Sequence, residues 1–394
     1  MNFDLSEEQR LLQDSAARYV QERCGFEQWQ RWRREGRQPG VELWPALAEM
    51  GWLALPFDSS DGGLDGGPVH TMVLMEALGR GLVAEPYLQT VVMGGEVLKR
   101  SPGLACRSKR LAAVQAGRSR IALACDEAAA RYDRSRVATI AEPAGDGWRL
   151  HGDKSVVIGG HDAHSFIVSA RTPAGVALFW VDGDAPGLTR RPYALVDGGM
   201  GADLTLSGVE LDDSARLSAP DGGLDLLEAA SAAGLAAMGA EAVGLVDLLL
   251  QQTIAYTSQR RQFGQPVARF QALRHRMVDM FMQAEQLRSI VVRATIGLAE
   301  GDEDLPRALS ALKVQVGKVG RFVGQQAVQL HGGMGMTDEI VIGHAFKRLL
   351  ALDAQLGNVD HHLQRFAALR ACETSPHTRS FAPSGAARRC KCSP

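Results

Sequence analysis

One stretch late in the chain, YTSQRRQFGQPVARFQALRH at residues 256–275, could bind a diphosphate. Arg260 ends one helical pattern, and Gly264 interrupts the chain before the next pattern begins. A guanidinium offers a planar fork of donors that suits diphosphate oxygens. Phe263 and Gln271 could stack on a nucleotide base or hydrogen-bond to it. On this segment alone, a solvated basic helix end is an equally good interpretation.

A second stretch, QLHGGMGMTDE at residues 329–339, could let the backbone approach a ligand closely, because it contains Gly332 and Gly333. No β-strand precedes it and its glycine spacing differs from a dinucleotide-binding fingerprint. By itself it favours a helix that ends in a glycine cap.

Acid/base or metal chemistry is suggested by LALDAQLGNVDHH at residues 350–362, where His361 and His362 follow two aspartates. The segment lies near the end of a long helical region. The six cysteines of the chain form no C-x-x-C pair, and Cys390-Lys391-Cys392 lies in a polar tail, so we expect no metal.

The elements that must position these residues fall into three zones. Helical periodicity covers residues 1–117, starting from a capping-box candidate at Ser6 and Gln9. Short β-rich runs separated by Gly, Pro and Asp cover 118–222 and predict a β barrel or sandwich.

The third zone, residues 223–370, is predicted to form long helices packed side by side. Apolar residues recur there at spacings of three and four, and this pattern assigns Phe281 to the core, with Met282 as a filler beside it. The final residues, 371–394, lack periodicity and are predicted to be a disordered tail.

The composition narrows the class further. The chain has 394 residues, is 45% hydrophobic and 22% charged, and carries a formal net charge of -2, so neither nucleic acid nor an anionic membrane is expected as partner. The amino terminus is polar rather than signal-like, and the sequence shows no apolar run of the roughly 20 residues that a membrane span needs. We expect a cytoplasmic protein.

Together, the two glycine-containing segments and the three zones resemble the acyl-CoA dehydrogenase family. The hairpin-like GDGWRLHGDKSVV and the helical LAAMGAEAVGLVDLLLQQTIAY support the resemblance, which covers nearly all of residues 1–370. It implies an α+β fold with an N-terminal helical domain, a central β domain, a C-terminal four-helix bundle and FAD between them.

The resemblance also implies roles for particular residues. One set would bind the diphosphate and adenine of an FAD held by a neighbouring subunit, in an oligomer that is commonly a dimer of dimers. The flavin ring would lie against the β domain, near Val156, Val157 and Ile158. The first set consists of Arg260, Gln262, Phe263, Gln271, Gln329, Gly332 and Gly333.

The family reaction needs a carboxylate that removes the α-proton of the acyl-CoA. Its usual position falls on Leu356 here, and the alternative on the first helix of the bundle falls on Gly234, so neither can act as a base. Glu241, two helical turns beyond Gly234, is a candidate for a displaced base, and Asp353 is a weaker one. The two histidines would lie beyond the reacting position, on a closing helix.

The β domain departs from the family pattern too. A Thr-Glu-Pro stretch followed by Gly/Ser is replaced by ACDEAAARYDRS, and a Trp-Ile-Thr triplet by residues 156–158, which removes a threonine hydroxyl. The first hypothesis is therefore an FAD-dependent subunit of a hetero-oligomeric acyl-CoA dehydrogenase, whose paralogous partner supplies the carboxylate and whose electrons pass to an electron-transfer flavoprotein. The alternatives are a self-sufficient homo-oligomer that uses Glu241, and a non-catalytic acyl-CoA- or FAD-binding subunit.

Overall fold

The computed structural model describes residues 4–35, 40–83, 85–101 and 107–374. The amino-terminal part is helical, as expected. The capping box forms, since the Ser6 hydroxyl accepts from Gln9 N–H and the Gln9 side chain accepts from Ser6 N–H. Its elements are α1 (Glu7–Arg23), α2 (Phe26–Arg34), α3 (Gly40–Glu49), η1 (Ser59–Asp61), α4 (Pro68–Arg80), η2 (Leu88–Gly94), α5 (Gly95–Lys99) and α6 (Arg107–Gln115).

The central part is a seven-stranded, mainly antiparallel sheet with the order β1-β4-β2-β3-β7-β6, in which β5 also pairs with β4. The hairpin-like stretch GDGWRLHGDKSVV provides the turn and second strand of a hairpin formed by β2 and β3, with Gly145 at a φ of 58° in the turn. The strands are β1 (Ile121–Ala124), β2 (Ile140–Ala144), β3 (Gly147–Ile158), β4 (Ser165–Thr172), β5 (Gly175–Asp182), β6 (Leu188–Ala194) and β7 (Met200–Asp212), followed by η3 (Asp213–Ala215).

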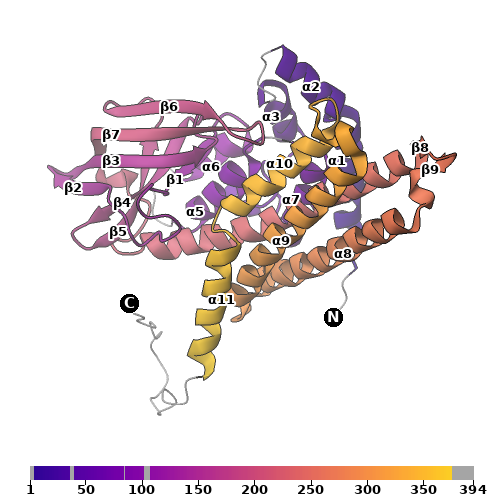
Figure 1. The fold of residues 1–394 in the computed structure, drawn as a ribbon. Helices are drawn as coiled ribbons and strands as arrows, with labels where there is room; N and C mark the ends of the chain where they lie inside the picture. Colours follow the sequence, from indigo (N-terminus) through magenta and orange to yellow (C-terminus); the bar gives the residue numbers. More distant parts are fainter. Residues whose placement is uncertain (1–3, 36–39, 84, 102–106, 375–394) are drawn as a thin grey trace.

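The carboxyl-terminal part is a bundle of long helices that lie side by side, with the sheet at one end and the small β8–β9 hairpin at the other (Figure 1). The last helix runs four residues past the predicted end of the bundle at residue 370. The elements are α7 (Gly223–Gln259), β8 (Arg261–Gln262), β9 (Gln265–Pro266), η4 (Val267–Arg269), α8 (Gln271–Glu300), α9 (Leu305–His331), η5 (Gly332–Met336), α10 (Val341–Ala354) and α11 (Val359–Thr374).

Helix α7 is the axis on which the other parts pack. It is apolar and long enough to cross a membrane, contrary to the expectation that no stretch of the chain would be, but 83% of its most apolar window is buried inside the protein. The buried surface is supplied by α4, α8 and α9, so α7 has the properties of a core helix rather than of a membrane span.

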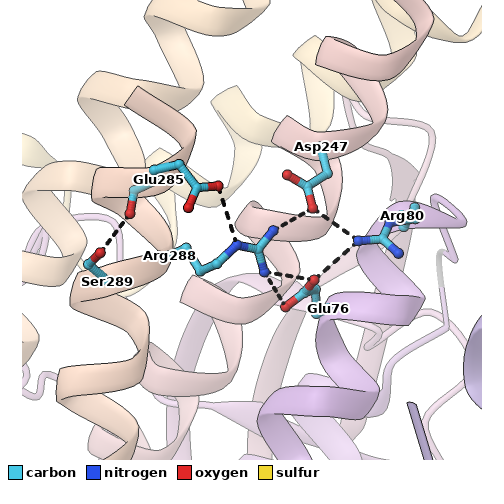
Figure 2. Close-up of polar contacts among 6 residues, drawn as sticks. All are labelled: Glu76, Arg80, Asp247, Glu285, Arg288 and Ser289. Atoms are coloured by element: carbon cyan, nitrogen blue, oxygen red, sulfur yellow. Dashed lines mark hydrogen bonds and ion pairs between the residues drawn. The ribbon is translucent and has the colours of Figure 1, made fainter. Parts of the chain in front are cut away.

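The N-terminal domain is fastened to the bundle by close backbone contact and by charge. Helix α4 crosses α7 so closely that a methyl group added at Gly244 would lie 2.0 Å from the Glu76 carbonyl oxygen. Beside this crossing, Arg288 of α8 reaches both Glu76 of α4 at 3.0 Å and Asp247 of α7 at 2.6 Å, as Figure 2 shows. Arg80 bonds the same two carboxylates, so three helices share one charge network.

Candidate functional site

A cavity of about 900 Å³ lies where the N-terminal helices, the sheet and the bundle meet. The π-helical segment η2 contributes Gln89 and Met93, and the end of β3 contributes Val156 and Ile158. Helix α7 contributes Ser231 and its neighbours, and the turn between α10 and α11 completes the wall. Ligand pockets typically measure roughly 300–1,000 Å³, so this one is large enough for a bulky ligand.

The two positions where the family usually carries its base, Gly234 and Leu356, lie next to each other beside the cavity. A methyl group added at Gly234 would lie 3.0 Å from the sulfur of Met93 and 3.2 Å from Cδ1 of Leu356. The absence of a side chain at Gly234 therefore leaves the space that Met93 and Leu356 occupy. Sequence numbers 234 and 356 become neighbours only in the fold, and no carboxylate stands at either.

The turn that carries Leu356 is held from behind by two buried side chains. Lys313 Nζ donates to the carbonyl oxygens of Asp353 at 2.8 Å and Gly357 at 2.6 Å, and burial lowers the pKa of Lys313 to about 8. His362 Nε2 bonds the Leu356 carbonyl oxygen at 2.8 Å. These bonds hold Leu356 in a left-handed conformation, with a φ of 55°, which costs a non-glycine residue about 1–2 kcal/mol.

The four carboxylates that line the cavity are all engaged. Glu127 bonds the fully buried Lys154 at 2.6 Å, and Asp126 lies 3.4 Å from Arg134. The Asp133 carboxylate accepts hydrogen bonds from the backbone N–H and the hydroxyl of Ser135, and Glu228 forms an ion pair with Arg365 of α11. Within the described part of the chain, each carboxylate of the cavity therefore has a hydrogen-bond or ion-pair partner.

The candidate base Glu241 is placed elsewhere by the structure. It does not line the large cavity, and its carboxylate pairs with Arg348 of α10 at 2.6 Å, which also bonds Asp197 at 2.8 Å. Both carboxylates are buried, and the pKa of Arg348, though lowered by burial, is raised overall by Glu241 and Asp197. The carboxylate of the predicted base Glu241 is therefore held in a buried ion pair and does not face the large cavity. Asp353 lies near Arg321, at 3.4 Å, and outside the cavity.

A β-bulge near the end of β3 determines which of residues 156–158 reach the cavity. Val156 has a φ of 53° and its N–H donates to Asp203, so its side chain is turned outward and is 51% exposed. Ile158 also lines the cavity, whereas the Val157 side chain is buried in the sheet core. Strand alternation turns the Val157 side chain inward, so only the backbone of this residue, which was predicted to lie near the flavin ring, is available to the cavity.

The proposed cofactor-binding residues gather at the far end of the bundle from the cavity. Phe263 and Gly264, with φ of 52° and 78°, form the tip of the β8–β9 hairpin, and the Phe263 side chain is 92% exposed. The end of α9 meets the end of α7 there, because the rings of Tyr256 and His331 stack with centroids 4.4 Å apart. We call this area the hairpin-end surface; it consists of Arg260, Gln262, Phe263, Gln271, Gln329, Gly332 and Gly333.

The hairpin-end surface cannot serve the cavity of its own chain. Helix α7 is continuous from the cavity residue Ser231 to Gln259, and at 1.5 Å per residue this separation is roughly 40 Å. Figure 1 shows the sheet and the hairpin at opposite ends of the molecule. The residues predicted to bind the diphosphate and adenine of FAD therefore lie at the opposite end of the chain from its cavity.

Comparison with known protein families covers nearly the whole chain. Three family models match: "Acyl-CoA dehydrogenase, N-terminal domain" over residues 6–111, "middle domain" over 122–214 and "C-terminal domain" over 221–368. The Mycobacterium tuberculosis protein named acyl-CoA dehydrogenase FadE27 is 28% identical over 82% of this chain and 86% of its own length.

Two solved structures are also similar. The ChsE4-ChsE5 complex from Mycobacterium tuberculosis contains a chain that is 25% identical, with a TM-score of 0.87 and coverage of 95% of this chain and 100% of that one. A chain of a Tcur3481-Tcur3483 steroid ACAD variant is 29% identical, with a TM-score of 0.83 and coverage of 93% and 98%. The chain thus belongs to the acyl-CoA dehydrogenase family, which comprises FAD-dependent oxidoreductases that act on acyl-CoA thioesters.

The residues present fit FAD in two halves. The cavity has room for a flavin ring beside Val156 and Ile158, although Ile158 carries no hydroxyl. At the other end, no atom lies within 4 Å of a methyl group added at Gly332 or Gly333, so the backbone there is open to a ligand. His361 also lines the cavity, contrary to the expectation that it lies beyond it. The sequence did not indicate this position, because both histidines belong to one helix whose register against the cavity is set only by packing.

Proposed function

We propose that the chain is an FAD-dependent acyl-CoA dehydrogenase-type subunit that acts in a hetero-oligomer, with a paralogous partner supplying the carboxylate of the principal reaction. The observation that carries the proposal is the pair formed by Leu356 and Gly234, which meet at the cavity wall and leave both base positions without a carboxylate. In the bound state FAD accepts the β-hydrogen of the acyl-CoA as hydride, and electrons then pass to an electron-transfer flavoprotein.

The division of the cofactor site supports assembly with a second subunit. Arg260, Gln271 and Gln329 lie roughly 40 Å from the cavity along α7, so they would bind the diphosphate and adenine of an FAD whose ring lies in a neighbour. A dimer of dimers satisfies this requirement for each cavity. The similar ChsE4-ChsE5 complex is named for two components, which supports a hetero-oligomer here.

The acyl group is proposed to be bulky. The cavity of about 900 Å³ is lined by apolar groups such as Met93, Leu235 and Leu356. One similar structure is described as a steroid ACAD, which supports a ring-containing acyl chain. A cytoplasmic location is part of the proposal.

The test is co-purification of the chain with its native partner, followed by a flavin count. We expect yellow protein that contains FAD, and dehydrogenation of acyl-CoA only by the complex. Arg260→Ala should lower the FAD content, because a diphosphate contact is removed, while Arg118→Ala should not, since that exposed arginine lies in the turn after α6.

Two outcomes would contradict the proposal. One FAD per chain with full turnover by the chain alone would indicate a self-sufficient homo-oligomer. A colourless complex without FAD would indicate a non-catalytic subunit that has retained the fold.

A further inference from the structure

His361 is a lining residue of the large cavity whose ring remains free to accept a proton. It is the third residue of α11, and its backbone N–H is capped by the Asn358 side chain at 3.0 Å. In the described part of the chain, no group hydrogen-bonds to either nitrogen of its ring. The four carboxylates of the cavity each have a hydrogen-bond or ion-pair partner other than His361, as described above.

The imidazole lies against the turn where the family carries its base. A methyl group added at Gly357 would lie 2.5 Å from Cδ2 of His361, and Gly357 directly follows Leu356. Tyr132 covers the ring from the cavity rim, with centroids 5.4 Å apart, and His362 packs edge-on at 5.1 Å. The ring is thus confined beside the position from which a carboxylate would act.

The surroundings keep this imidazole neutral. Burial lowers the pKa of His361 below its ordinary value of 6.5, and the positive charges of Arg365, Arg134 and Lys313 lower it further, against an opposing effect of Asp133. His362 on the same helix is also neutral at pH 7, because burial lowers its pKa to about 4. A neutral imidazole with an unbonded nitrogen is a competent general base near pH 7.

We propose that His361 is the proton acceptor of this chain's own cavity and removes the α-proton of a bound acyl-CoA thioester. The C–H bond breaks and the proton bonds to an imidazole nitrogen, which becomes an imidazolium. The electron pair remains on the substrate as an enolate, and FAD, when bound, would supply the acceptor for the β-hydrogen as hydride. The inference rests on the proposed function for its ligand, and adds to it a base that differs from the partner's carboxylate.

The experiment measures proton removal without turnover. Phenylacetyl-CoA has acidic α-hydrogens and no β-hydrogen that can leave as hydride, so exchange of its α-hydrogens in D2O, followed by NMR, reports the base alone. The full chain should catalyse this exchange, and His361→Gln should slow it about 100-fold or more, because a general base contributes roughly 10²–10⁴. His151→Gln, which alters an exposed histidine of β3, should leave the rate unchanged.

A second variant guards against a merely structural effect. Leu356→Glu added to His361→Gln places a carboxylate on the adjacent turn and should restore exchange. In the wild type the rate should fall with decreasing pH as His361 is protonated, at a pH below the ordinary histidine value because burial lowers its pKa, whereas the double variant should keep exchanging to lower pH, since carboxylates titrate near pH 4. Binding of phenylacetyl-CoA, measured by calorimetry, should be similar in all variants.

Either of two results overturns the inference: no exchange by the wild-type chain that binds phenylacetyl-CoA, or exchange at the wild-type rate by His361→Gln. Neither touches the proposed function, because dehydrogenation and flavin content of the hetero-oligomer are measured separately. Conversely, a chain that exchanges the α-hydrogens but binds no FAD would support His361 as the base and contradict the proposed FAD-dependent function.

Discussion

At the scale of the residue, the turn at Leu356 is held by buried hydrogen bonds but lacks the carboxylate that the family carries there. Lys313 and His362 are buried and together bond three carbonyl oxygens of the turn, and the left-handed conformation of Leu356 persists because these bonds hold it. Strained conformations of this kind occur at functional sites. Leu356 itself can accept no proton, and the imidazole of His361, which we propose as the base, lies beside the turn.

The burial of His362 predicts a pH-dependent stability. The unfolded chain binds a proton at this residue near pH 6.5, whereas burial lowers the pKa in the folded chain to about 4. Stability is therefore complete above about pH 6.5 and falls as the pH drops toward 4, because only the unfolded state binds the proton. Denaturant unfolding at pH 7 and pH 5 should show this loss.

His362→Gln should reduce that difference between pH 7 and pH 5, while lowering the free energy of unfolding at pH 7 through the altered bond to Leu356. His151→Gln, at an exposed position, serves as the control. An unchanged pH difference in His362→Gln would show that other groups cause it.

At the scale of the element, the crossing of α4 and α7 positions α7, whose first turns line the cavity. Gly244 allows the two backbones to touch, and about one turn away a methyl group at Gly79 would lie 2.2 Å from the Glu241 carbonyl oxygen. The Glu241 side chain then turns to Arg348, which joins α7 to α10. The position of Glu241 on an Ala/Gly-rich helix is thus explained by an ion pair that the sequence could not reveal.

Gly244→Ala should destabilise the protein by about 1–3 kcal/mol, because the added methyl group forces α4 away from α7 and strains the network around Arg288. Thermal unfolding, monitored by circular dichroism, measures the change. Gly25→Ala is the matched control, since no atom lies within 4 Å of its added methyl group. Equal melting temperatures for the two variants would refute the packing argument.

At the scale of the whole molecule, two features of the chain support the proposed assembly with other subunits. Its cavity lies at one end and its hairpin-end surface at the other. Helix α8 also leaves Val278, Phe281 and Met282 about half exposed. The helical periodicity predicted Phe281 and Met282 in the core, which the isolated chain contradicts. Large apolar groups that remain exposed on one helix mark an interaction surface.

Phe281→Asp should weaken subunit association by at least about tenfold in Kd, because it buries a charge where an aromatic ring is expected. Sedimentation velocity should show a smaller species, and FAD content should fall with it. Leu11→Asp changes an apolar side chain that is 65% exposed on α1, and should leave the assembly intact. A Phe281→Asp protein of unchanged mass would place the interface elsewhere.

Local patterns determined much of this protein in advance. Periodicity predicted the helix–sheet–helix order, the capping box at Ser6 predicted the start of α1, and glycine predicted the end of α9 at His331. The two C-terminal segments indicated the family, and counting from them located the missing carboxylate at Leu356. These features are local because they depend on residues a few positions apart.

The tertiary structure decided which side chains share a space. It paired Glu241 with Arg348, 107 positions away, turned Val157 into the sheet through a bulge, and placed Gly234 beside Leu356. It also brought His361 into the cavity that its sequence position had suggested it would miss. Burial, charge pairing and helix crossing join residues that are distant along the chain, so no local pattern contains them.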